Sequence, residues 1–173
     1  MTGRRQQEFA EFFTARFDFA RRIGYALCGD WNEAEELAQT AFVRMYAAWG
    51  RVRTETADAY LRTVLTRVFL DTRRRGRARE KTVADVPDTP VTDAYSEERD
   101  ALVAALAQVP AKQRAVLVLR FLQDLSVEQA ASTLGCSVGT VKSQTTRGLR
   151  NLRVAYQALT GEAQIAGLTG YAG

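Results

Sequence analysis

Histidine is absent from this chain of 173 residues, and cysteine occurs only at positions 28 and 136. Without histidine or a CxxC pair, a structural zinc site and a histidine-dependent catalytic triad are excluded. Two separated thiols are typical of a protein kept in a reducing compartment. No signal-peptide core follows Met1 and no apolar run could span a bilayer, so we expect a cytoplasmic protein without membrane insertion.

The motifs that mark common enzymes are missing as well. The sequence has no glycine-rich phosphate loop, no HExxH pair and no nucleophile elbow. Glu33, Glu35 and Glu36 form a cluster of carboxylates, but an acidic first turn of a helix, favoured by the helix dipole, explains them. We therefore expect no enzymatic activity, no cofactor and no metal.

Lysine is scarce too, with three occurrences, so arginine carries almost all of the positive charge. Arginine suits bidentate contacts with phosphate, although a GC-rich genome would produce the same skew. The charge is also unevenly distributed, because residues 81–98 hold one lysine and five acidic side chains while the segments on both sides are basic. The net charge of +4 in this arrangement is compatible with nucleic acid as a partner.

The most informative stretch is 125–153, which predicts two helices joined by a tight turn. Ser126 and Gln129 have the spacing of a capping box. Gly135 stands where the first helix would end in a left-handed residue, and Ser137 would cap the second helix. The second helix combines an apolar stripe with a short polar and cationic face, which is typical of a helix-turn-helix that enters the major groove. A solvated helical hairpin is the alternative at this level.

Three more helices are predicted upstream, at 5–27, about 32–49 and about 57–75. The first has four phenylalanines along one side, a pattern typical of a packed core. A polar loop at 51–56 carries two arginines, and the third helix ends in a run of arginines. That run suits the dipole at a solvated helix end, and it would serve equally well as a phosphate clamp.

Helical periodicity is lost from about 76 to 95, where two prolines stand among acidic residues, and it resumes near Glu97. The predicted fold class is therefore all-α, with two small helical domains joined by a flexible acidic linker. The expected boundaries are 1–78 for the first domain, 79–96 for the linker, 97–159 for the second domain and 160–173 for a mobile tail with room for a short docked segment.

Two parts of the sequence resemble a known family. The run AEELAQTAFVRMYAAW at 34–49, followed by AYLRTVLTRVFLDTRRR at 59–75, resembles region 2 of bacterial RNA polymerase sigma factors. The run VPAKQRAVLVLRFLQDLSVEQAASTLGCSVGTVKSQTTRGLRNLR at 109–153 resembles region 4. With no recognisable domain between them, the chain resembles the extracytoplasmic-function (ECF) class, and TRVFLDTRRR resembles its SigE-like actinobacterial branch. The resemblance implies a three-helix region 2 bundle and a region 4 helix-turn-helix bundle.

The resemblance also implies a function, that of a transcription initiation factor that binds core RNA polymerase, directs it to −35/−10 promoters and assists promoter melting. The expected partners are promoter DNA and, on the polymerase, the beta-prime clamp helices and the beta flap. Members of the class are often held inactive by an anti-sigma factor, a partner of which the sequence itself says nothing. The acidic linker would thread through polymerase channels that otherwise hold nucleic acid, although a solvated linker would have the same composition.

Site residues carry over from the motifs position by position. The residues expected to bind the polymerase are Glu36, Leu37, Gln39, Thr40, Phe42 and Arg44. The residues expected to bind the −10 element are Arg51, Arg53, Arg62, Arg67, Arg73 and Arg74. The residues expected to bind the −35 element are Lys142, Ser143, Gln144, Thr146, Arg147 and Arg150. Of these, Lys142, Ser143 and Thr146 would contact bases. Many members have asparagine at the position of Arg67, which leaves the preferred −10 base open.

Two other functions fit parts of the sequence. A free-standing helix-turn-helix regulator would use the N-terminal helices only to dimerise, and it would bind a palindromic operator without polymerase. In a third hypothesis the N-terminal helices are a protein-interaction module and the helix-turn-helix is vestigial. The segment 34–75 favours the sigma factor, because a simple repressor has no need of it.

Overall fold

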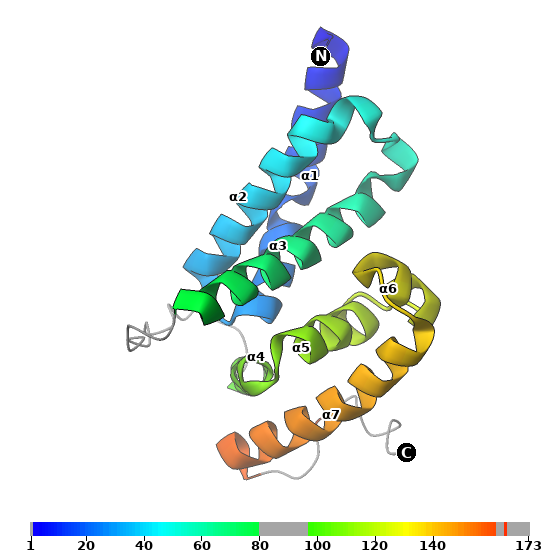
Figure 1. The fold of residues 1–173 in the computed structure, drawn as a ribbon. Helices are drawn as coiled ribbons and strands as arrows, with labels where there is room; N and C mark the ends of the chain where they lie inside the picture. Colours follow the sequence, from blue (N-terminus) through cyan, green and yellow to red (C-terminus); the bar gives the residue numbers. More distant parts are fainter. Residues whose placement is uncertain (1, 80–96, 162–164, 166–173) are drawn as a thin grey trace. The chain divides into compact units, whose positions relative to one another are not determined.

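The computed structural model of the chain describes residues 2–79, 97–161 and 165. In these residues all regular secondary structure is helical, and the chain splits into two compact units (Figure 1). The predicted all-α fold class with two helical domains is confirmed. The predicted acidic linker, apart from Arg79, lies outside the described residues, as does most of the predicted tail. None of the described helices is both long enough and apolar enough to cross a membrane.

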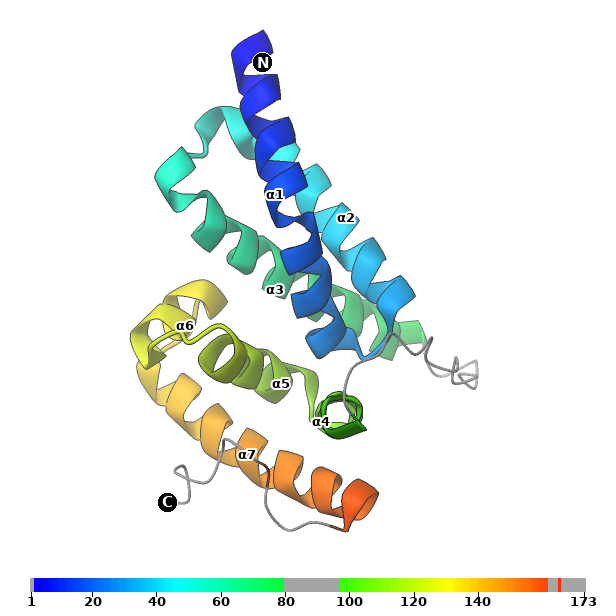
Figure 2. The ribbon, with the colours of Figure 1, turned by 180° about the vertical axis from the view of Figure 1, so that it is seen from behind.

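The first unit is a bundle of three helices, α1 (Gly3–Cys28), α2 (Trp31–Ala48) and α3 (Ala57–Arg79). Helices α1 and α2 form an antiparallel hairpin, and α3 packs against both, as the two opposite views show (Figures 1 and 2). Gly29 ends α1 with a positive φ of 78°. Asp30 then caps α2, since its side chain accepts a hydrogen bond of 2.8 Å from the backbone N–H of Glu33.

Aromatic rings fill one end of the interface between α1 and α2, and at the other end the two helix backbones approach each other closely. The rings of Phe9, Phe12, Phe13 and Phe17 on α1 all pack against Phe42 of α2. At the other end, a Cβ added to Gly24 would lie 3.0 Å from the carbonyl oxygen of Ala34. The phenylalanine stripe packs against α2 at the edge of the core, because Phe9, Phe12 and Phe17 are half-buried and Phe13 is 38% exposed. The predicted core position of the stripe is therefore confirmed only in part. At the other end, a glycine lets the two backbones approach.

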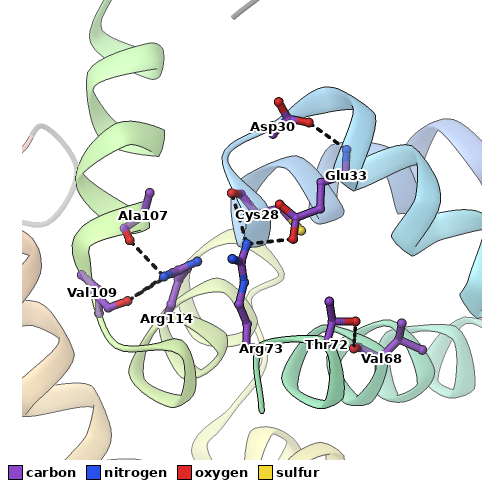
Figure 3. Close-up of polar contacts among 9 residues, drawn as sticks. All are labelled: Cys28, Asp30, Glu33, Val68, Thr72, Arg73, Ala107, Val109 and Arg114. Atoms are coloured by element: carbon purple, nitrogen blue, oxygen red, sulfur yellow. Dashed lines mark hydrogen bonds and ion pairs between the residues drawn. The ribbon is translucent and has the colours of Figure 1, made fainter. Parts of the chain in front are cut away.

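Polar contacts hold α3 to the other two helices. Arg16 of α1 binds the carboxylate of Asp58 in a bidentate pair, with Nε–Oδ1 and Nη2–Oδ2 distances of 2.6 and 3.2 Å. Arg73 of α3 forms an ion pair of 2.9 Å with Glu33 and donates to the carbonyl oxygen of Cys28 (Figure 3). These contacts fix both ends of α3 against the hairpin.

Helix α3 is longer than the predicted span, because it continues through Gly76 to Arg79. Glycine inside a helix costs only about 1 kcal/mol relative to alanine. The arginines and the alanine around it are good helix formers, so they sustain the helix across that position. The expectation that regular structure ends near residue 76 is wrong by about one helical turn.

The second unit contains α4 (Glu97–Gln108), α5 (Ala111–Leu117), a π-helical turn η3 (Val118–Leu122), α6 (Val127–Leu134) and α7 (Val138–Thr160). Helix α7 packs against both α4 and α5. The buried core of this unit comprises Ala105, Leu106, Val109, Leu117, Leu149, Leu152, Tyr156 and Ile165. Ile165 belongs to the predicted tail, and it is one of the buried members of this core.

A buried arginine organises the start of this unit. The side chain of Arg114 is 7% exposed, and it donates hydrogen bonds to the carbonyl oxygens of Ala107 and Val109 at 3.0 and 2.9 Å (Figure 3). These carbonyls belong to the end of α4 and the turn after it, where a helix leaves acceptors unsatisfied. A cation there also complements the helix dipole. This role of Arg114 was not predicted from the sequence.

Candidate nucleic-acid interface

The helix-turn-helix formed by α6 and α7 contains the helix caps and the glycine turn that the sequence predicts. The backbone N–H of Ser126 donates to Gln129 Oε1 at 2.8 Å, and the N–H of Gln129 donates back to Ser126 Oγ at 3.0 Å. This reciprocal pair is the predicted capping box. Gly135 in the turn has a φ of 66°, and Ser137 Oγ accepts from the N–H of Thr140 at 3.0 Å. The predicted caps and the left-handed turn are confirmed.

One side of α7 is fixed in the core of the second unit. Val141, Leu149 and Leu152 are buried, in agreement with the predicted stripe. Gly148 lies between them and faces α5 so closely that a Cβ there would lie 3.1 Å from Cγ of Leu117. Because the inner side of α7 is fixed in this way, the orientation of its outer side is fixed as well.

The outer side of α7 carries the residues predicted for −35 binding. The exposed ones are Lys142, Ser143, Thr146, Arg147 and Arg150. Gln144 is half-buried, and its Oε1 atom is buried without a hydrogen-bond partner among the described residues. The hydroxyls of Ser143 and Thr146 donate to backbone carbonyls of α7 itself, at 3.1 and 3.2 Å, so their oxygens can still accept from a base. The structure thus places five of the six residues on one accessible surface.

In the first unit, an open cavity lies beside the segment that joins α2 to α3. This segment consists of two 3-10 turns, η1 (Trp49–Arg51) and η2 (Thr54–Thr56), and we call residues 49–56 the capture loop. The cavity has a volume of about 510 Å³ and is lined by Ala48, Arg51, Val52, Arg53, Thr56, Ala59, Tyr60 and Thr63. Such a volume is typical of small-ligand pockets, roughly 300–1,000 Å³, and has room for a nucleobase.

The six arginines predicted for −10 binding lie in different surroundings. Arg51 and Arg53 line the cavity, and Arg67 is exposed on α3. Arg62 is half-buried. Arg73 is half-buried and pairs with Glu33, as described above, and Arg74 pairs with Asp71 at 3.2 Å. The structure therefore brings two of the six together at the cavity.

The loop 51–56, which the sequence analysis singled out, supplies half of the residues that line the cavity, and sequence reasoning missed the residues that the helices supply. Ala48, Tyr60 and Thr63 come from two helices and meet only because of the bundle. It also missed Arg5, whose Nη1 donates to the carbonyl oxygens of Trp49 and Val52 at 3.0 and 3.5 Å. No local pattern connects residues 44 and 47 positions apart, so no sequence signal was available.

The predicted polymerase-binding residues on α2 divide between surface and core. Glu36, Gln39, Thr40 and Arg44 are exposed, and Arg44 lies 3.5 Å from Asp71 of α3. Leu37 and Phe42 are 5% and 2% exposed, so they support the helix from inside. Val43 is 70% exposed, which sequence reasoning missed, although its helical spacing from Glu36 and Thr40 places all three on one face.

One carboxylate of the first unit has a shifted pKa. The hydrogen bond from Arg16 lowers the pKa of Asp58, partial burial opposes the shift, and the positive charges of Arg16 and Arg62 add to it. Asp58 lies at the start of α3, directly before Ala59 of the cavity wall. No group of three or more histidine, cysteine, aspartate or glutamate residues among the described residues is arranged to hold a metal ion.

Comparisons with known proteins agree with this geometry. Residues 12–79 match the family model "Sigma-70 region 2", and residues 99–152 match "Sigma-70, region 4". The "RNA polymerase sigma-E factor" of Streptomyces coelicolor is 36% identical over 149 residues, which cover 84% of each chain. The protein of the same name from Streptomyces avermitilis is 39% identical over 149 residues, covering 84% of this chain and 83% of the other.

Among solved structures, the fold is similar to that of the sigma factor RpoE from Bartonella quintana, crystallised in complex with the anti-sigma factor NepR. The TM-score is 0.70 at 24% sequence identity, and the match covers 87% of this chain and 98% of the other. At this identity the likeness concerns the fold alone.

Proposed function

Because the chain belongs to the extracytoplasmic-function class of the sigma-70 family, we propose that each of its two units reads one element of a promoter. The protein is a non-enzymatic transcription initiation factor that binds core RNA polymerase and directs it to −35/−10 promoters. The single observation that carries the division of labour is the combination of a cavity with room for a base in one unit with an accessible helix-turn-helix surface in the other. The free-standing regulator is set aside, because the region 2 match covers the N-terminal unit.

The second unit reads the −35 element through α7. The N-terminal half of this helix enters the major groove, where Lys142, Ser143 and Thr146 contact base edges. Arg147 and Arg150 bind the adjacent phosphates. The exposure of all five and the fixed inner side of α7 support this proposal. Gln144 contributes less, since it is turned toward the protein.

The first unit captures one unpaired base of the −10 element in the cavity beside the capture loop. Arg51 and Arg53 at its rim would hold the sugar–phosphate backbone, and Tyr60 would offer a ring against which a base can stack. Arg67 lies further along α3, exposed, where it would meet the neighbouring DNA. Arg73 acts by holding α3 in the bundle, as its contacts with Glu33 and Cys28 support.

The outer face of α2 binds the clamp helices of the polymerase beta-prime subunit. Its exposed residues Glu36, Thr40 and Val43 combine charge, polarity and an apolar side chain on one helical face, a composition suited to a protein partner. We place the protein in the cytoplasm, where the polymerase acts. An anti-sigma factor is a further proposed partner, of the kind bound to the Bartonella protein. The boundaries 1–78, 79–96, 97–159 and 160–173 stay predictions.

The test is run-off transcription by core polymerase, with and without the protein, on a library of −35/−10 templates. Initiation that requires the protein and depends on both elements is expected. Lys142→Ala and Thr146→Ala should each weaken the −35 preference, by about 1–3 kcal/mol of discrimination per lost base contact. Arg67→Asn should change the −10 preference. Gln157→Ala, exposed on the distal half of α7, is the control. Tight binding to duplex DNA without polymerase, and no initiation, would overturn the proposal.

A further inference from the structure

A second cavity lies between the capture loop and the first turns of α1. It has a volume of about 480 Å³ and is lined by Thr2, Arg4, Arg5, Glu8, Arg51, Val52, Arg53, Thr54 and Glu55. Three of these residues, Arg51, Val52 and Arg53, also line the first cavity. The loop therefore borders both cavities, and the first turns of α1 line the second one as well.

The charges in this second cavity favour an anion. Four arginines face two glutamates, and both glutamates are already paired, Glu8 with Arg4 at 3.2 Å and Glu55 with Arg53 at 3.7 Å. Arg51 forms no ion pair within the described residues. Arg5 is bound to the carbonyl oxygens of Trp49 and Val52 through Nη1, and its Nε and Nη2 form no hydrogen bond within the described residues. Two guanidinium groups with unused donors therefore remain available.

We propose that this second cavity binds the phosphate of the nucleotide next to the captured base, with Arg5 and Arg51 as its ligands. The proposal rests on the base-capture function proposed for the first cavity. A strand whose base enters one side of a thin loop must carry its adjoining phosphate past the edge of that loop. The guanidinium group of Arg5 is held at this edge by its two carbonyl contacts, so it is oriented before DNA arrives. The start of α1 thereby becomes part of the −10 site.

The experiment measures binding of holoenzyme, made of core polymerase and the full chain, to forked −10 DNA. Each phosphate near the captured base is replaced in turn by an uncharged methylphosphonate. For wild-type protein, one replacement should weaken binding about tenfold, as expected for loss of a charge-assisted hydrogen bond. The Arg5→Gln protein should bind the unmodified DNA less tightly than wild type. In this variant the same methylphosphonate should weaken binding less than about twofold, because the guanidinium group that would bind the phosphate is already absent.

Several variants separate this role from a purely structural one. Arg5→Lys keeps the charge and should restore part of the sensitivity to that phosphate. Arg51→Gln, exposed in the loop, gives a second measurement that does not depend on the carbonyl contacts of Arg5. Arg22→Gln is the matched control, because this exposed arginine of α1 donates within its own helix, to the carbonyl oxygen of Asp18. It should leave the phosphate profile unchanged.

The outcomes also separate the two proposals. If every methylphosphonate weakens wild-type, Arg5→Gln and Arg51→Gln proteins equally, while base preference in the −10 element persists, the second cavity does not bind the phosphate and base capture still holds. If base substitutions in the −10 element change binding for none of the proteins, base capture itself fails and the second cavity loses its basis with it.

Discussion

At the scale of single residues, Arg114 is a buried charged side chain that supports the second unit. Its buried guanidinium satisfies carbonyl oxygens that no helical N–H can reach. Replacement by methionine keeps much of the volume but leaves Ala107 and Val109 without donors. We expect Arg114→Met to lower the free energy of unfolding of the second unit by about 2–3 kcal/mol. Urea unfolding followed by circular dichroism measures the change.

The control for this variant is Arg150→Met, on the exposed side of α7. It should change the unfolding free energy by less than about 0.5 kcal/mol, as surface substitutions usually do. Equal unfolding midpoints for Arg114→Met and Arg150→Met would contradict the role assigned to Arg114.

The ion pair of Arg16 and Asp58 predicts a pH dependence. Because Arg16 lowers the pKa of Asp58 in the folded protein, the pair stabilises above the unfolded pKa of about 3.9. This contribution is lost as the pH falls through the folded pKa. Both side chains are more than 40% exposed, so we expect Asp58→Asn to cost no more than about 1 kcal/mol at pH 7.

Urea titrations between pH 7 and pH 2.5 test this expectation. The difference between wild-type and Asp58→Asn proteins should shrink steadily below about pH 4. Asp18→Asn, whose nearest arginine nitrogen lies 3.9 Å away on the exposed side of α1, serves for comparison. A difference that stays constant over the whole range would show that the charge of Asp58 is not the cause.

At the scale of elements, two glycines inside helices should respond to alanine in opposite ways. Gly24 lies where α1 meets α2, and its added Cβ would lie 3.0 Å from a backbone oxygen. Moving the helices apart should cost about 1–3 kcal/mol. Gly76 in α3 has no atom within 4 Å of the added Cβ, so Gly76→Ala should stabilise by up to about 1 kcal/mol through helix propensity.

Thermal unfolding of the two variants beside wild type gives the comparison directly, since each is the control for the other. Gly24→Ala should lower the midpoint and Gly76→Ala should raise it. If both midpoints shift in the same direction, helix propensity alone determines the effect of alanine at these positions. The close approach of α1 and α2 would then not contribute to stability.

The elements themselves were largely predictable, because capping signals act within a few residues. Ser126 with Gln129, Gly135 and Ser137 fixed the helix-turn-helix correctly. The start of α2 was predicted at Asn32, and the observed cap is Asp30. Both residues cap well, and the structure uses the earlier one, with Trp31 stacked on Tyr25 of the preceding helix at a centroid distance of 4.0 Å. A contact between two helices thus decided between two acceptable local signals.

The candidate site was predictable only where one helix presents it. The exposed face of α7 follows from helical spacing, because its buried side is apolar. The cavity beside the capture loop does not, because Ala48, Tyr60 and Arg51 come from three elements and have no shared pattern. The hydrogen bonds from Arg5 to the carbonyl oxygens of Trp49 and Val52 join residues even further apart in the sequence. They can be recognised only in the packed bundle.

At the scale of the whole molecule, the core of the second unit includes one residue beyond α7. Ile165 is 6% exposed and lies in the same core as Leu106 and Tyr156. Replacing it by serine removes the burial of an isoleucine side chain, so we expect Ile165→Ser to destabilise this unit by about 1.5–3 kcal/mol. A chain that ends at Leu159 also lacks Ile165, so its second unit should be destabilised by the same amount. Differential scanning calorimetry of the full chain measures both.

Leu159→Ser is the control for the tail, because this leucine is 54% exposed. It should unfold close to wild type. Identical melting of the Ile165→Ser and Leu159→Ser proteins would mean that the tail adds nothing to the core, and the function of residues beyond α7 would then have to be sought elsewhere.

The bond between Arg5 and the capture loop has a consequence for synthesis on the ribosome. Arg5 is translated 44 and 47 residues before the two carbonyl groups that it binds. At elongation rates of about 5–20 residues per second, this corresponds to a delay of about 2–9 seconds. During that interval the start of α1 has been synthesised, but the segment 49–56, whose carbonyl oxygens Arg5 will bind, has not. The segment 49–56 therefore takes its final position after the leading helix of the first unit has been made, when the nascent chain already contains both helices of the hairpin.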